Sequence, residues 1–265
     1  MLVSVKIKEV LHALEEFAPL PLQEDYDNAG LQVGFTETEV SGALLCLDIT
    51  EAVIDEAIRK DCNLIVSHHP LIFRALKRVA DENMVQRCVV KAIQSGITII
   101  SMHTNLDNAV GGVNYKMAQK LGMREVELLD KKCVNGTECG SGVIGTLQQP
   151  LGAKEFVEML KDTFRVEGVQ ANQLLTRNIQ RVALCGGAGA FLLGKAMRAG
   201  ADAFVTGEMH YHEFFGVEQQ IQICVIGHYQ SEQYTNEILK SIIEEKCGEV
   251  RCCLAETCTN PIIYL

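Results

Sequence analysis

Histidines and carboxylates recur in this sequence at short spacings that suit metal binding. His68 and His69 are adjacent in "SHHPLIF", directly after the apolar run "NLIV". Two other stretches carry a histidine four residues before an acid, namely "HTNLD" (His103, Asp107) and "HYQSE" (His228, Glu232). Imidazole and carboxylate together suit Zn, Fe, Mn, Co or Ni better than Ca or Mg, which prefer oxygen ligands. The sequence therefore predicts a transition-metal site.

The adjacency of His68 and His69 sets a geometric condition. Consecutive residues of a regular strand point to opposite faces, so two such histidines serve one metal only if the chain turns there. Pro70 holds its own φ at about −65° and biases His69 toward an extended conformation, which fits a turn that begins at the histidines. Such a turn could also direct the two rings at two metals ~3.5–4 Å apart, which would deprotonate a bridging water. A bridging carboxylate is then needed, and Glu232 and Asp107 are the candidates.

The elements that must position these residues follow from the alternation of short β-branched runs with runs of helical period, which indicates α/β layers. We expect strands at about Gly42–Leu47, Asn63–Ser67, Thr98–Met102 and Val143–Leu147. We expect helices at about Ser4–Phe17, Glu51–Lys60, Asn83–Ser95, Asn114–Leu121 and Ala153–Thr163. All histidines except His12 follow expected strands, once the strands of the repeat in the second half are included, and ligands of open α/β sheets bind at the carboxyl ends of strands.

The two halves of the sequence repeat one pattern. The stretch "LLCLDITEAVIDEAIRKDCNLIVSHHPLIF" matches "ALCGGAGAFLLGKAMRAGADAFVTGEMHYH" without a gap, so that Leu45 aligns with Leu184 and Val66 with Val205. In the stretches that follow, the pair His103 and Asp107 aligns with the pair His228 and Glu232. The shared order of strand, turn, helix and strand predicts an internal duplication of an α/β unit, with coincidence as the alternative that one chain leaves open.

Length and charge restrict the class of protein. A chain of 265 residues fits one large domain or two lobes of ordinary size. The net charge of −10 argues against a protein that works by holding phosphate backbones. No apolar run approaches the ~20 residues that span a bilayer. The eleven cysteines form no C-x-x-C and are expected as buried free thiols, so we expect a cytoplasmic protein.

Five motifs in combination resemble the Nif-three-like family. They are "DNAGLQVG", "SHHPLIF", "HTNLDNAVGGVN", "GADAFVTGEMHYHEF" and "GHYQSE", and they cover nearly the whole chain. Members of this family are named dinuclear metal centre proteins or GTP cyclohydrolase I type 2 homologues. The resemblance implies a two-lobed, internally duplicated α/β fold with the metal site between the lobes at strand carboxyl ends. It also implies the short form of the family, which lacks an inserted domain.

The resemblance further implies two divalent metal ions per chain, with Glu232 as the bridging carboxylate. The other ligands that it implies are His68, His69, Asp107 and His228. It implies a homohexameric ring as the assembly. We expect an N-terminal lobe over residues 1–125 and a C-terminal lobe over residues 126–265, and we leave open that the final segment packs back on the first lobe.

Other polar residues of the motifs have two readings each. His103 and His212 are candidate catalytic residues together with Glu232, as proton carriers near the metals, although a structural role is the alternative. Asp27, Asn28 and Glu208 are candidates for the wall of a substrate pocket, with a turn as the alternative for the first two. The turn "GGAGAF" suits either a phosphate cradle or tight packing of a strand against a helix.

These observations favour a metal-dependent hydrolase that acts on a nucleotide or a phosphoester-like small molecule. The alternative is a non-catalytic metal-binding protein that regulates or binds a partner. A ring that threads single-stranded nucleic acid is disfavoured, because aromatic residues make up only 6% of the chain and the charge is acidic. We expect neither nucleic acid nor a membrane as a partner.

Overall fold

The chain is organised in two compact units. The computed structural model describes residues 4–263. Of the described residues, unit 1 contains residues 4–106 together with Thr235–Pro261, and unit 2 contains Asp107–Tyr234 with Ile262 and Ile263. This division differs from the expected boundary after residue 125, because the chain leaves unit 1 at residue 106 and returns to it at residue 235. Unit 1 is therefore built from two segments that are distant in the sequence.

Unit 1 contains a five-stranded sheet in the order β1-β4-β3-β2-β11. The strands from β4 to β11 are parallel, and only β1 runs antiparallel to its neighbour. These strands are β1 (Gly30–Val33), β2 (Ala43–Cys46), β3 (Leu64–Ser67), β4 (Thr98–Ser101) and β11 (Cys252–Leu254). Its helices are α1 (Ile7–Phe17), α2 (Glu51–Arg59), α3 (Met84–Gln94) and α9 (Thr235–Lys246), with a 3-10 turn, η1 (Leu20–Leu22).

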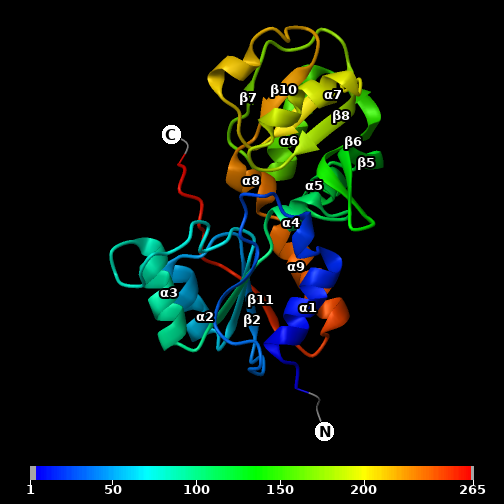
Figure 1. Cartoon of the computed structure of the whole chain (residues 1–265). Coiled ribbons are helices and arrows are strands. Elements are labelled where there is room, and N and C mark those ends of the chain that lie inside the picture. The colour runs from blue at the N-terminus through cyan, green and yellow to red at the C-terminus, as the bar shows by residue number, and fades with distance from the viewer. Residues whose placement is uncertain (1–3, 264–265) are drawn as a thin grey trace. The chain divides into compact units, whose positions relative to one another are not determined.

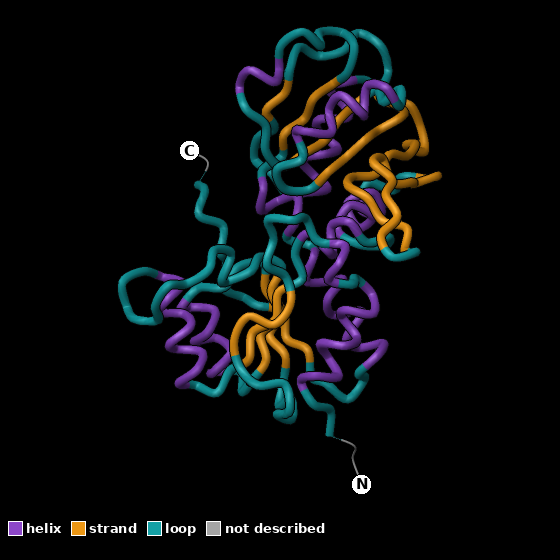
Figure 2. Tube along the Cα trace, viewed as in Figure 1, coloured by secondary structure: helices purple, strands orange, loops and turns teal. Residues whose placement is uncertain are grey.

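Helices cover both faces of this sheet. α2 and α3 lie side by side on one face, and α1 and α9 lie on the other (Figures 1 and 2). Alternate strand residues explain the arrangement, since Leu44, Ile65 and Ile99 pack into one core with the buried faces of α2 and α3. Thr50 and Asn83 cap these two helices by accepting hydrogen bonds from backbone N–H groups of the first turn.

Unit 2 contains a six-stranded sheet in the order β5-β6-β8-β9-β10-β7. The strands β8, β9 and β10 are parallel, and the outer strands are antiparallel to their neighbours. The strands are β5 (Arg124–Val134), β6 (Thr137–Leu151), β7 (Gln170–Ala171), β8 (Ile179–Cys185), β9 (Ala203–Thr206) and β10 (Gln222–Val225). The helices are α5 (Val113–Lys120), α6 (Ala153–Phe164), α7 (Leu193–Arg198) and α8 (His228–Glu232), with 3-10 turns η2 (Ala190–Leu192) and η3 (Tyr211–Phe214).

Side chains of unit 2 alternate between two cores along each central strand. On β8, Val182 and Leu184 pack with α5 and α6, whereas Ala183 packs with α7. On β9, Val205 joins the first of these cores and Phe204 the second. A sheet that is buried on both faces requires such near-continuous apolar strands, so both units are α/β layers as the sequence predicted.

The connection between β5 and β6 in unit 2 is a tight hairpin turn. Its two-residue turn consists of Asn135 and Gly136, with φ of 51° and 83°. Asn-Gly is the preferred pair for such a turn because both residues tolerate positive φ. The position at which the short form was expected to lack an inserted domain is thus closed by a tight turn.

The predicted repeat is present in the strand register. Leu45 of β2 pairs with Val66 of β3, and the aligned residues Leu184 of β8 and Val205 of β9 also pair. In both units a third parallel strand follows, β4 after β3 and β10 after β9. The two units therefore repeat the same three-stranded parallel motif residue for residue.

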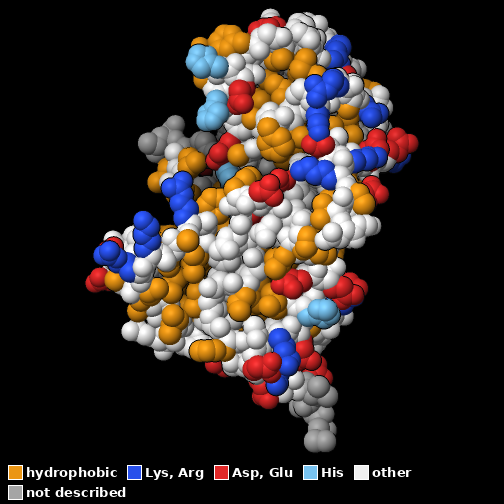
Figure 3. Space-filling view, in the orientation of Figure 1, with side chains coloured by type: hydrophobic (Ala, Val, Ile, Leu, Met, Phe, Trp, Pro, Cys, Tyr) orange, Lys and Arg blue, Asp and Glu red, His pale blue; other side chains and the backbone are white. Residues whose placement is uncertain are grey.

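A short helix, α4 (Thr104–Asn108), occupies part of the stretch "HTNLDNAVGG" that was expected as a loop, and the division between the units falls within it. All eleven cysteines are free thiols, and seven of them are buried. Among the helices of residues 4–263, none has the length and apolar character required to cross a membrane. The face shown in Figure 3 carries acidic and basic side chains interspersed with hydrophobic ones.

Candidate metal centre

Three histidines of unit 1 form a compact group, here called the histidine cluster: His68, His69 and His103. One ring nitrogen of each lies within 4.8 Å of the others. His68 and His69 follow β3, and His103 follows the adjacent parallel strand β4, so all three lie at carboxyl ends of the sheet. The ring centroids of His68 and His69 are 5.0 Å apart, and that of His103 lies 5.3 and 5.5 Å from them. His103, which was not expected among the ligands, thus belongs with the other two.

The backbone turns at the two adjacent histidines. The N–H of His68 donates to the carbonyl of Cys46 at 3.2 Å, and the N–H of His69 donates to the carbonyl of Leu47 at 2.9 Å. In a regular strand, successive N–H groups point to opposite sides, so both cannot bond to the same neighbour. The chain therefore leaves the regular pleat before Pro70, which brings both rings to one side.

Each histidine of the cluster is held through its Nδ1 atom. The acceptors are the carbonyl oxygen of Met102 at 2.8 Å for His68, Asp48 Oδ1 at 2.7 Å for His69, and Asp27 Oδ1 at 2.7 Å for His103. These oxygens accept, so Nδ1 carries the proton, and in the neutral ring Nε2 carries the lone pair. Metal-binding histidines are held in this way, since the second hydrogen bond fixes the tautomer and the ring orientation.

The two aspartates that hold these rings are ionised. Burial alone would raise the pKa of Asp27, but hydrogen bonds from His103 and Thr104 outweigh it and lower that pKa to about 2. Burial also opposes ionisation of Asp48, yet the hydrogen bond from His69 holds the pKa of Asp48 below its ordinary value. Asp27 was expected in the wall of a substrate pocket, but its side chain is 0% exposed and serves to position His103.

Unit 2 contributes a second group, here called the acid–histidine set: Asp107, His228 and Glu232. His228 and Glu232 lie one turn apart on α8, which places Nε2 of His228 3.1 Å from Oε2 of Glu232. A carboxylate oxygen of Asp107 lies within 4.8 Å of one of Glu232. On its other side, Nδ1 of His228 is 3.0 Å from Oε1 of Glu208. The His-x-x-x-acid spacing thus places its two side chains in contact here, as helical periodicity requires.

The acid–histidine set creates a negative potential. Burial raises the pKa of the Cys185 thiol, and the carboxylates of Asp107 and Glu232 raise it further. Two carboxylates that approach each other repel unless a cation or a proton lies near them. The charge of this set therefore favours a cationic occupant.

A glycine turn allows Glu232 to adopt its position. Gly187 has a φ of 59°, and a Cβ atom there would overlap Oε1 of Glu232. The N–H groups of the turn at Gly186, Gly187 and Gly189 donate to the side chains of Asn114, Ser231 and Thr206. Because these donors are used within unit 2, the structure favours tight packing over a phosphate cradle for "GGAGAF".

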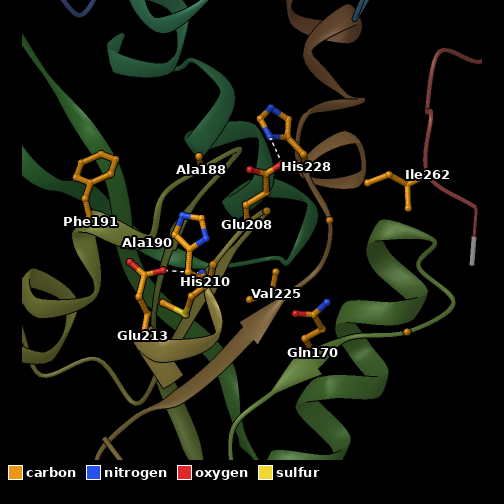
Figure 4. Close-up of a pocket in the computed structure, with 14 residues that line it drawn as sticks. Gln170, Ala188, Ala190, Phe191, Glu208, His210, Glu213, Val225, His228 and Ile262 are labelled. Carbon is orange, nitrogen blue, oxygen red and sulfur yellow. Dashed lines mark hydrogen bonds and ion pairs between the residues drawn. The ribbon is translucent and has the colours of Figure 1, made fainter. Parts of the chain in front are cut away.

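A cavity of about 480 Å³ in unit 2 adjoins His228 (Figure 4). Glu208, expected in the wall of a substrate pocket, lines it together with His210, Glu213 and Phe191. His212, expected near the metals, lies on η3 with its ring 5.2 Å from that of Tyr211 and is not among the lining residues. Asn28 lies in unit 1, where its side chain donates to the carbonyl of Ile72 at 2.6 Å.

The donor chemistry of both groups fits divalent transition metals. The histidine cluster offers neutral imidazole nitrogens that are oriented by hydrogen bonds, and the acid–histidine set adds carboxylates that neutralise charge. Calcium and magnesium prefer oxygen shells, so this mixture favours Zn, Fe, Mn, Co or Ni.

The chain is similar in sequence and structure to known proteins. The sequence model of the family described as Duf34/NIF3 (NGG1p interacting factor 3) matches residues 5–261. The chain belongs to the Duf34/NIF3 family. This membership confirms the resemblance that the five motifs indicated.

Named relatives and one solved structure support the Duf34/NIF3 assignment. The chain is 33% identical to a GTP cyclohydrolase 1 type 2 homolog of Clostridium acetobutylicum over 231 residues, which cover 86% of each chain. It is 32% identical to a protein NIF3 homolog of Schizosaccharomyces pombe over 249 residues, 89% of this chain and 87% of that protein. The crystal structure of a hypothetical protein of Staphylococcus aureus matches with a TM-score of 0.90 at 26% identity, covering 99% of this chain and 100% of that one.

Sequence reasoning missed two residues that position this Duf34/NIF3 site. Asp48, which holds His69, follows β2 directly, so the rule that polar residues at strand ends form the site could have found it. The sequence indicates Gly187 only as part of a glycine-rich turn. Nothing in the sequence relates it to Glu232, which is distant along the chain.

Proposed function

We propose that this protein is a metal-dependent hydrolase in which the histidine cluster and the acid–histidine set together hold two divalent metal ions. The observation that supports this most strongly is the anchoring of three histidine rings through Nδ1, with Nε2 as the lone-pair nitrogen in each. A hydrogen bond at Nδ1 alone also occurs in structural histidines, but here three such rings converge with nitrogens within 4.8 Å of one another, as a metal site requires. Membership of a family with relatives named GTP cyclohydrolase 1 type 2 homolog agrees with the proposal.

The proposed ligands divide between the two units. His68, His69 and His103 supply imidazoles from unit 1. From unit 2, Asp107 and His228 would supply one ligand each, and Glu232 would be the bridging carboxylate. When bound, a pair of such ions lowers the pKa of a water molecule and so provides a nucleophile at neutral pH.

Carboxylates of the chain orient the histidine rings that would bind the metals. Asp27 and Asp48 fix the tautomers of His103 and His69, so that these rings present lone pairs at once. The carboxylate of Glu208 holds Nδ1 of His228 in the same manner. If His103 is not a ligand, its Nε2 can take a proton from water and pass it to the leaving group, while Asp27 at Nδ1 stabilises the charged ring.

The substrate class of the proposal is a nucleotide or a phosphoester-like small molecule, and the test is a turnover screen. Metal-loaded protein is incubated with nucleotides, dinucleotides and phosphoesters, and the Glu232→Gln variant is compared in the same assay. We expect the variant to lose bound metal and turnover together. Full turnover by a metal-free variant would contradict the proposal.

A non-catalytic role is the second candidate, because the family description names an interacting factor. In that case the metals stabilise a surface that binds a partner, and the hexameric ring implied by the resemblance presents it in several copies. Absence of turnover with every compound of the screen, together with a stable partner in a pull-down, would favour this role. Light scattering after size-exclusion chromatography tests the hexamer itself.

A further inference from the structure

The cavity of unit 2 shares a residue with the proposed metal centre. His228 is a member of the acid–histidine set and also lines the cavity. A volume of about 480 Å³ lies within the usual range of ~300–1,000 Å³ for small-molecule sites. A group bound in this cavity therefore lies beside the metal centre.

The charge of the lining decides against phosphate. Among the described residues that line the cavity, Glu208 and Glu213 are acidic and none is lysine or arginine. Phosphate sites rely on arginine, lysine or unused backbone N–H groups. In the glycine turn beside the cavity, the N–H groups of Gly187 and Gly189 donate to the hydroxyls of Ser231 and Thr206, so they are not available to a phosphate. A polyphosphate would thus meet two carboxylates without a compensating cation from the lining.

The remaining walls suit a flat and largely apolar group. Phe191 is 68% exposed and lines the cavity, and it is joined by Met209, Val225 and Ile262. Figure 4 shows Phe191 on one side of Glu208 and His210, with Ile262 and Gln170 on the other. Exposed aromatic rings and thioethers at a concave site favour stacking with a planar partner.

Glu208 connects recognition to the metal centre. One oxygen of its carboxylate, Oε1, is 3.0 Å from Nδ1 of His228, and the residue also lines the cavity. An ionised carboxylate accepts hydrogen bonds at both oxygens and donates none. Glu213 also has one oxygen engaged, since its Oε2 accepts the backbone N–H of His210 at 2.6 Å, but only Glu208 of the two contacts His228. The lining thus offers one strong acceptor next to His228.

From this cavity, its walls and the position of Glu208, we propose that unit 2 binds a planar, uncharged nitrogen heterocycle that presents N–H donors, such as a purine base. The ring packs on Phe191, and Glu208 accepts its N–H groups. Phosphate groups of the same molecule lie outside the cavity. The inference rests on the proposed hydrolase in that the bound base would belong to its substrate.

Binding is measured by isothermal titration calorimetry on the metal-loaded full chain, separately from turnover. The probes are guanosine, which presents adjacent N–H donors, and 1-methylguanosine, in which a methyl group replaces the ring N–H. We expect guanosine to bind about tenfold or more tightly than its methylated form, because the latter leaves a carboxylate oxygen unpaired. Inorganic tripolyphosphate serves as the phosphate probe.

Two variants test the assigned roles against matched controls. Phe191→Ala should weaken guanosine binding about tenfold, whereas Phe215→Ala, at an exposed phenylalanine of unit 2 outside the cavity lining, should not. Glu208→Gln retains an acceptor for His228 but presents an amide donor to the ligand. On samples matched for metal content, it should therefore abolish the preference for guanosine over 1-methylguanosine, unlike the exposed Glu218→Gln.

Equal affinity for the two nucleosides, or equal effects of each variant and its control, would overturn the inference. It would also be overturned if tripolyphosphate binding depended on Phe191 and Glu208. Metal content measured on the same samples separates this outcome from failure of the proposed function. Normal metal loading without selective nucleoside binding contradicts the inference alone, whereas loss of metal binding in the wild type contradicts the proposed metal centre.

Discussion

Nδ1 of His103 lies 2.7 Å from Oδ1 of Asp27, a carboxylate that is 76 positions earlier in the chain and has no exposed surface. The hydroxyl and the N–H of Thr104 also donate to this aspartate. The pairing fixes the proton of His103 on Nδ1. Asp48 makes the equivalent contact with His69, so two of the three histidines in the cluster are held by carboxylates.

Replacing Asp27 tests whether this support matters for metal binding. In Asp27→Asn the charge is lost and the amide N–H₂ competes with the donors of Thr104, so His103 loses its fixed tautomer. We expect metal affinity to fall by ~10–100-fold, as is usual for such supporting residues. Competition with a fluorescent chelator measures the change. Asp25→Asn, at an exposed position nearby, is the control, and equal affinities of the two variants would refute the role of Asp27.

The adjacent histidines give a prediction about stoichiometry. If His68 and His69 serve different ions, His68→Ala and His69→Ala should each remove mainly one metal. Elemental analysis of each variant, alongside a thermal melt that verifies folding, measures this. The account of the pair is wrong if both variants keep two metals with unchanged affinity. Because His68 is buried, its variant is expected to be the less stable of the two.

Substitution of Gly187 tests whether the close packing of Glu232 against this glycine matters for metal binding. Gly187→Ala introduces a Cβ that overlaps Glu232 Oε1, in addition to the strain of an L-residue at positive φ. Gly200→Ala is the matched control, since Gly200 has a φ of 73° with no atom within 4 Å of the added Cβ. Both should lose about 1–2 kcal/mol of unfolding free energy from backbone strain. Only Gly187→Ala should also lose bound metal, and equal metal content would contradict this reading.

The predictable part of the fold lies in the central parallel strands. Their apolar runs, bounded by polar strand ends, located β2, β3 and β4 from local pattern alone. The edge strands β1 and β11 escaped prediction, because they are short and their pairing depends on distant segments. Register and the return of the chain to unit 1 are tertiary properties that periodicity does not encode.

The site also contains residues that the sequence indicates and others whose role only the structure shows. Residue type and spacing made His68, His69, His228 and Glu232 candidates, and their role as metal ligands stays a prediction. The role of Asp27 could not be predicted, because its motif "YDNAG" reads equally as a turn or a pocket wall. Only burial against His103 and Thr104 shows that this carboxylate holds a ring.

A buried carboxylate of unit 1 predicts acid sensitivity. Burial would raise the pKa of Glu56, yet hydrogen bonds from Lys60, Thr257 and the N–H of Glu256 lower it from 4.5 to about 2. Its folded pKa is depressed, so its contribution to stability is complete above about pH 4.5 and is lost as the pH falls toward 2.

Glu56→Gln should therefore lower the unfolding free energy at pH 7 by about 2–3 kcal/mol, with the difference from wild type shrinking between pH 5 and pH 2. Urea denaturation at a series of pH values measures this. Glu245→Gln, at an exposed glutamate of α9, is the control and should follow the wild type. A difference that stays constant with pH would show that Glu56 acts through packing rather than charge.

The proposed function depends on a paired metal centre, and elemental analysis of the purified chain after reconstitution is the decisive test of that pair. Inductively coupled plasma mass spectrometry gives both the identity and the stoichiometry of the bound metal. We expect two equivalents of a divalent transition metal per chain, lost together in Glu232→Gln. Fewer than one equivalent after reconstitution would contradict it.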